Sequence, residues 1–101
     1  MPFGLTNKEI QAIHSVFKKF PNVRKVVILG SRAMGNFKKG SDVDLAIMGK
    51  IKSETVDKIS SILNEETTLP YLFDVIHYES ITNKELKRHI DEHGALFYDG
   101  K

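Results

Sequence analysis

Residues 41–48 read Ser-Asp-Val-Asp-Leu-Ala-Ile-Met, and Gly49 follows them. The run from Val43 to Met48 is apolar apart from one acid, which predicts a buried β-strand. Because side chains alternate across a strand, Asp42 and Asp44 project from one face, about 6.6 Å apart along it. Two carboxylates held this way repel each other, and a divalent cation such as Mg²⁺ would relieve the repulsion. The alternative interpretation is a turn at Ser41-Asp42 with Asp44 facing solvent.

The segment before this strand ends in a glycine-serine turn. Val23 to Leu29 is β-branched and apolar and predicts a second buried strand, and Gly30-Ser31 follows it directly. A glycine lets backbone N–H groups approach phosphate oxygens closely, and a serine hydroxyl adds a donor. The loop from Gly30 to Gly40 has neither the Walker pattern nor the spacing of a dinucleotide-binding fingerprint. Taken alone, the turn is a weak signal for anion binding.

A third acid lies inside a later apolar segment. Asp74 stands in Tyr71 to His77, which predicts a third strand. Burying an ionised carboxylate without a partner costs several kcal/mol. We therefore expect this strand beside Val43 to Met48, so that Asp74 reaches the same cations as Asp42 and Asp44. A pair of Mg²⁺ ions bridged by carboxylates serves in-line nucleotidyl displacement. An edge position for Asp74, or its salt bridge to a lysine, is the alternative.

Helical periodicity fills the intervals between these strands. The sequence predicts helices over Asn7 to Phe20, Ser53 to Glu66 and Thr82 to His93, with a short edge strand over Ala95 to Tyr98. Thr6 with Glu9, Ser53, and Thr82 with Glu85 are the predicted N-terminal caps. The order indicates a small α/β (α+β) fold, in which helices pack on a mixed sheet.

Composition restricts the class of protein. The 101 residues allow one compact domain, and the chain has no cysteine, which favours a reducing cytoplasm. No apolar run approaches the ~20 residues of a membrane span, and Met1 to Leu5 lacks the features of a signal peptide. The net charge is +2, but residues 18–52 hold nine basic residues and two acids. This stretch would attract a polyanion, and without interleaved aromatic residues a nucleoside triphosphate fits better than a nucleic acid.

Two segments of the chain together resemble the signature of the nucleotidyltransferase superfamily that includes DNA polymerase β. They are Gly30-Ser31-Arg32-Ala33-Met34-Gly35 and, after a gap, Ser41-Asp42-Val43-Asp44. In particular the chain looks like the minimal nucleotidyltransferases (MNT), small prokaryotic proteins with little beyond the catalytic palm. The likeness covers nearly the whole chain, residues 1–101. It implies a palm-like fold and a metal-dependent nucleotidyltransferase that uses ATP and releases pyrophosphate.

The resemblance also assigns roles to individual residues. It implies that Gly30, Ser31 and Arg32 bind the nucleotide phosphates. It implies that Asp42, Asp44 and Asp74 are the catalytic acids and hold Mg²⁺, two ions in all, with Asp74 helping to activate the attacking hydroxyl. Relatives often carry a basic residue where this chain has Met34, so one phosphate contact is absent.

Relatives are commonly encoded beside a helical HEPN-type ribonuclease toxin and act as its antitoxin. Some of these relatives transfer AMP from ATP to a tyrosine of that toxin (AMPylation). The resemblance therefore implies a toxin-antitoxin pair, a hetero-oligomer with a HEPN-type partner. A second hypothesis is a non-catalytic antitoxin that neutralises its partner by complex formation, and a weaker third is non-specific nucleic-acid binding.

Overall fold

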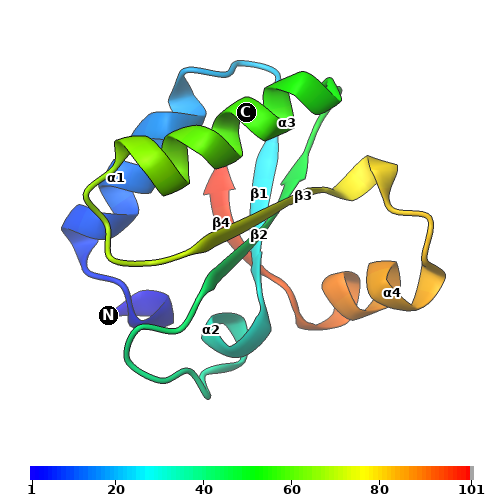
Figure 1. The fold of residues 1–101 in the computed structure, drawn as a ribbon. Coiled ribbons are helices and arrows are strands. Elements are labelled where there is room, and N and C mark those ends of the chain that lie inside the picture. The colour runs from blue at the N-terminus through cyan, green and yellow to red at the C-terminus, as the bar shows by residue number, and fades with distance from the viewer. Residues whose placement is uncertain (101) are drawn as a thin grey trace.

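The computed structural model describes residues 1–100, which fold into a four-stranded mixed sheet with helices on both faces (Figure 1). In chain order the elements are η1 (Pro2–Gly4), α1 (Asn7–Lys18), β1 (Lys25–Leu29), α2 (Gly30–Met34), β2 (Val43–Met48), α3 (Ser53–Ser61), η2 (Ile62–Glu66), β3 (Phe73–His77), η3 (Tyr78–Ser80), α4 (Lys84–His93) and β4 (Ala95–Asp99). The predicted α/β (α+β) fold class is confirmed.

The strands lie in the order β3-β2-β1-β4. β1 pairs antiparallel with both β2 and β4, whereas β2 and β3 run parallel. The parallel pair is joined by α3 and η2, which supply the crossover that such a connection requires. β3 therefore lies directly beside β2, as predicted, and it is an edge strand of the sheet.

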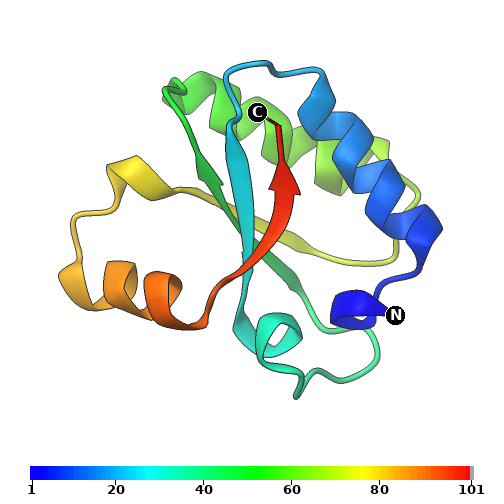
Figure 2. The same ribbon diagram turned by 180° about the vertical axis from the view of Figure 1, so that it is seen from behind.

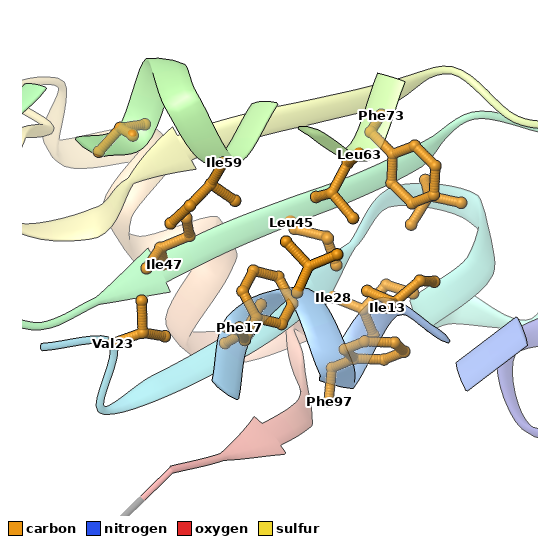
Figure 3. Close-up of a cluster of buried hydrophobic side chains, with 14 of the residues drawn as sticks. Ile13, Phe17, Val23, Ile28, Leu45, Ile47, Ile59, Leu63, Phe73 and Phe97 are labelled. Carbon is orange, nitrogen blue, oxygen red and sulfur yellow. The ribbon is translucent and has the colours of Figure 1, made fainter. Parts of the chain in front are cut away.

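One face of the sheet carries the main hydrophobic core. Alternate residues of β1 and β2, among them Ile28, Leu45 and Ile47, are fully buried on this face. α1 and the α3–η2 segment cover it through Phe17 and Ile59, as Figure 3 shows. The period of two in the strands and the helical spacing in α1 thus meet in one core.

The opposite face is covered more thinly by α4 (Figure 2). Leu29 of β1, Ala46 of β2 and Ile90 of α4 form a small second cluster. Asp44 precedes Ala46 by two residues in β2, so its side chain projects on this second face. The acidic residues therefore lie outside the main core.

Several bounds and caps of the predicted elements differ from the structure. α1 ends at Lys18, β1 begins at Lys25 and β3 begins at Phe73, so each of these elements is two residues shorter than predicted. The N-cap of α4 is Asn83, whose side chain accepts from the N–H groups of Glu85 and Leu86, so the cap predicted at Thr82 is wrong. The residue that caps α3 is Lys52, without a side-chain hydrogen bond, and Ser53 is the first helical residue. The last turn predicted for that helix is the π-helical segment η2. The reciprocal cap of α1 by Thr6 and Glu9 is confirmed.

No helix within residues 1–100 combines the length and apolar character that crossing a membrane requires.

Candidate functional site

The three acids predicted for the site lie at one end of the sheet. Asp44 and Asp74 are register partners on the parallel strands β2 and β3, and Asp42 stands one residue before β2 begins. Partners in register point to the same face of a sheet. The predicted approach of Asp74 to the other two acids is therefore what the strand order produces.

The surroundings of Asp74 differ from the prediction. β3 is an edge strand and the Asp74 side chain is exposed, as is that of Asp42, whereas Asp44 is half-buried. The inference that Asp74 is a buried charge requiring a cation is wrong. Its neighbours Phe73 and Val75 pack in the main core, while the edge position leaves the Asp74 carboxylate exposed.

Asp44 is the acid most affected by its neighbours. Partial burial raises the pKa of the Asp44 carboxyl, and the negative charges of Asp74 and Asp42 raise it further. Desolvation and like charge both disfavour the ionised form. The arrangement is therefore one of unrelieved repulsion among three carboxylates.

Gly30 brings the backbone against this acid. Leu29 is the register partner of Asp44, and Gly30 follows it with φ +70°, a conformation that favours glycine. A Cβ atom built at Gly30 would lie 2.6 Å from Oδ2 of Asp44. The missing side chain thus leaves room for the Asp44 carboxylate beside the first turn of α2, where Ser31 follows.

Arg32 does not occupy the place that the resemblance implied. Its side chain is 3% exposed, and its guanidinium donates to the carbonyl oxygens of Ser41, Phe3 and Gly4. A side chain enclosed among backbone carbonyls has little surface to offer a phosphate. Lys38 and Lys39, two exposed residues, line a cavity of about 320 Å³ together with Arg32 and Tyr71.

Sequence reasoning missed one residue that holds the edge strand. Asn64 of η2 accepts from the Phe73 N–H at 2.8 Å and donates to the Phe73 carbonyl at 3.0 Å. The Asn64 amide thus pairs with both backbone groups of Phe73, as a neighbouring strand would, one residue before Asp74. An asparagine near the end of a helix carries no signal for this contact, which depends on the fold.

The donor set suits a hard cation, since carboxylate oxygens are the preferred ligands of Mg²⁺. Yet among residues 1–100 the side chains, as placed, form no group of three or more Asp, Glu or His that could hold a metal ion. The acids are adjacent in the fold without being closed around a point. A bound cation would therefore have to draw the exposed Asp42 and Asp74 inward.

A cavity away from the acids lies at the other end of β2. It has a volume of about 610 Å³ and is lined by residues that include Arg24, Gly49 and His77. Gly49 follows the C-terminal end of β2, whereas Asp44 lies near the N-terminal end of that strand. The size of this cavity therefore says nothing about the acidic site, and the arrangement of carboxylates is the better guide to chemistry.

Residues 11–101 match the family model described as polymerase beta, nucleotidyltransferase. No curated protein matches the sequence.

The fold is shared with solved structures of low sequence identity. A toxin-antitoxin structure with AMP-PNP has a TM-score of 0.72 at 15% identity, over 93% of this chain and 74% of that one. The toxin-antitoxin MntA-HepT gives 0.69 at 13%, over 93% and 73%. A tri-AMPylated HEPN toxin of Shewanella oneidensis in complex with MNT antitoxin gives 0.61 at 14%, over 89% and 72%.

The family match spans nearly the whole chain and includes the glycine-serine turn and all three acids. The low identities to the solved structures establish the shared fold only. By the family match, this chain belongs to the polymerase-beta-type nucleotidyltransferases.

Proposed function

We propose that this chain transfers a nucleoside monophosphate, AMP from ATP, to a hydroxyl group of an acceptor protein. The observation that carries the proposal is the register pairing of Asp44 with Asp74 beside the close backbone approach at Gly30. Nothing in ordinary packing requires two like charges directly opposite each other, because such a pair is destabilising. A reaction that handles phosphate and its counter-ions gives a reason for it.

In this reaction the acceptor oxygen attacks the α-phosphorus, the bond to the bridging oxygen of the β-phosphate breaks, and pyrophosphate leaves. We assign the acceptor proton to Asp74, because its carboxylate is exposed at the sheet edge where an acceptor can approach. Asp42, Asp44 and Asp74 would hold Mg²⁺, which when bound supplies Lewis-acid neutralisation of phosphate charge. Gly30 and Ser31 would contribute N–H and hydroxyl donors to the phosphates.

The proposed acceptor is a tyrosine of a HEPN-type partner protein, with this chain as the antitoxin. Two of the similar folds come from the toxin-antitoxin MntA-HepT and from an MNT antitoxin in complex with a tri-AMPylated HEPN toxin. Those are other proteins, and the shared fold supports the same class of partner here.

The test is transfer of labelled AMP from ATP to a co-purified HEPN-type protein encoded beside this chain, with Mg²⁺ or with EDTA. We expect transfer with Mg²⁺ only, and a loss of at least about 100-fold in Asp42→Asn and Asp44→Asn, in keeping with the loss of electrostatic stabilisation at a transferring group. Asp57→Asn, an exposed acid on α3, is the matched control. Absence of transfer with all four nucleoside triphosphates, or full activity in Asp44→Asn, would contradict the proposal.

One observation favours a second candidate, a non-catalytic antitoxin that acts by complex formation. The three acids, as placed within residues 1–100, form no ready metal site. If binding alone neutralises the partner, the triple change of Asp42, Asp44 and Asp74 to asparagine will preserve growth rescue in cells that express the toxin. Loss of rescue while the complex still forms would favour the enzyme.

A further inference from the structure

We propose that Arg32 is a positioning residue, which fixes the loop that carries Asp42 and does not contact the nucleotide. The inference rests on the proposed function, because its catalytic consequence requires that Asp42 takes part in transfer. It also makes a structural claim that holds independently of any activity. The loop in question is residues 36–42, between α2 and β2.

The guanidinium is bonded to the end of this loop. Nε and Nη2 of Arg32 donate to the carbonyl oxygen of Ser41 at 3.1 and 2.8 Å. Ser41 immediately precedes Asp42. Two N–H groups in the fixed fork geometry of arginine determine the direction of that carbonyl, and with it the peptide unit from which Asp42 extends.

The other side of the guanidinium is bonded to the N-terminal segment. Nη1 donates to the carbonyl oxygens of Phe3 at 2.9 Å and Gly4 at 3.3 Å. Phe3 has φ +58° and Gly4 has φ +71°, so two consecutive residues adopt left-handed backbone. This conformation is costly for phenylalanine and persists where surrounding contacts determine it. The left-handed turn therefore directs the carbonyl oxygens of both residues toward Arg32.

Aromatic rings enclose the same group. The Arg32 guanidinium carbon lies 4.7 Å from the ring centre of Tyr71 and 5.5 Å from that of Phe37. The Tyr71 hydroxyl donates to a Glu9 carboxylate oxygen at 2.9 Å. The pKa of Glu9 is lowered chiefly by the hydrogen bond from the Thr6 N–H and, to a smaller extent, by the Arg32 charge. The buried cation thus has hydrogen bonds, ring faces and a nearby counter-charge, which burial of an arginine requires.

Two hydrogen bonds within the loop close it into a turn, and Arg32 connects this turn to the rest of the fold. The Lys38 N–H donates to the Ser41 hydroxyl at 2.8 Å, and the Ser41 N–H donates to the Lys38 carbonyl at 3.0 Å. These bonds close the turn on itself without fixing its position. The Arg32 bonds to Ser41 hold that closed turn against α2 and the N-terminal segment, and so place Asp42 next to Asp44.

The test compares Arg32→Met and Arg32→Lys with Arg24→Met, which removes an exposed guanidinium at the other end of β1. In Arg32→Met we expect amide hydrogen exchange at Lys38 and Ser41 to accelerate at least tenfold, while Val26 to Ile28 keep wild-type rates. We expect kcat for AMP transfer to fall at least tenfold with KM for ATP within twofold. Arg24→Met should leave both readouts unchanged.

Arg32→Lys keeps the charge and loses the planar fork, so we expect intermediate exchange and an intermediate kcat. If Arg32→Met does not fold, this variant decides the question. A tenfold rise in KM with unchanged kcat would show a phosphate contact and overturn the proposal, as would wild-type exchange at Lys38 and Ser41. If the wild-type chain transfers nothing, the proposed function fails, and the exchange measurement alone decides whether Arg32 positions the loop.

Discussion

Asp44 and Asp74 stand directly opposite each other on parallel strands, and their like charges face the same side of the sheet. Like charges in register are destabilising, and the pKa of Asp44 is raised by its partial burial and further by the charges of Asp74 and Asp42. The Asp44–Asp74 pair therefore lowers the stability of the folded state. Residues that reduce stability in this way are typical of functional sites.

The first prediction concerns the pH dependence of stability. The pKa of Asp44 is raised above 3.8, so the native state binds this proton more tightly than the unfolded state. The resulting stabilisation is complete below the unfolded pKa and is lost as the pH rises through the folded pKa. In metal-free buffer at pH 7, Asp44→Asn will be more stable than wild type by about 0.5 kcal/mol, the scale of a solvent-screened charge pair.

The measurement is urea denaturation in EDTA at pH 7 and at pH 3, with Asp57→Asn as the control. At pH 3 the advantage of Asp44→Asn should disappear, because the acid is then protonated in both states. An advantage that is independent of pH, or a destabilised variant at pH 7, would contradict the assigned repulsion.

The second prediction separates backbone strain from contact at Gly30. Gly30 and Gly35 both have positive φ, +70° and +83°, but a Cβ at Gly35 meets nothing within 4 Å. Gly35→Ala will cost about 1–2 kcal/mol for the left-handed conformation alone. Gly30→Ala will cost about 1 kcal/mol more, because its Cβ displaces the Asp44 carboxylate.

Thermal or urea unfolding measures both changes, and the double variant Gly30→Ala with Asp44→Ala provides the control. Removal of the carboxylate should recover the excess cost at Gly30. Equal costs at the two glycines would show that Asp44 moves aside freely.

Much of the fold follows from local pattern. The bounds of β2, Val43–Met48, were predictable because an uninterrupted apolar run ends at a glycine. The place of β3 beside β2 was predicted, whereas the pairing of β4 with β1 was not. The placement of Asp74 beside Asp44 follows from that topology, whereas its exposure does not, because a sequence does not reveal which strand forms the edge of a sheet.

Contacts with distant backbone were beyond the sequence. Arg32 follows a glycine-serine turn and carries a positive charge. In the sequence, these features fit an arginine that binds phosphate as well as one that binds backbone carbonyls. Its actual partners, the carbonyls of Phe3, Gly4 and Ser41, are recognisable only once η1 folds against α2. The two hydrogen bonds between the Asn64 amide and the Phe73 backbone, which we call the Asn64 clamp, were not predicted for the same reason: they join residues that only the fold brings together.

The third prediction tests this clamp. Asn64→Ala removes both hydrogen bonds to the Phe73 backbone and will lower the free energy of unfolding by about 1–2 kcal/mol. Asn64→Asp keeps the acceptor for the Phe73 N–H and loses the donor, so it will fall between wild type and alanine. Amide exchange of β3 is the second readout, and it should accelerate at Phe73 while β1 keeps its rates. Unchanged exchange at Phe73 would mean that strand pairing with β2 alone holds this edge.

The fourth prediction distinguishes two neighbouring residues at the start of α4. The tetrapeptide Thr-Asn-Lys-Glu occurs at 6–9 and again at 82–85, yet its threonine caps α1 whereas its asparagine caps α4. Asn83→Ala will therefore cost about 1 kcal/mol, and Thr6→Ala a similar amount. Thr82→Ala, at an exposed position outside the cap, will stay within about 0.5 kcal/mol of wild type.

Urea midpoints at constant m-value measure the three alanine variants of these cap positions. The contrast isolates the effect of register, because both copies offer the same side chains and differ in where the helix begins. Asn83 accepts from two N–H groups of the first turn, at 2.9 and 3.0 Å, which leaves the Thr82 hydroxyl without a role in the cap. A cost at Thr82 equal to that at Asn83 would show that α4 begins one residue earlier in solution, with the reciprocal arrangement seen at α1.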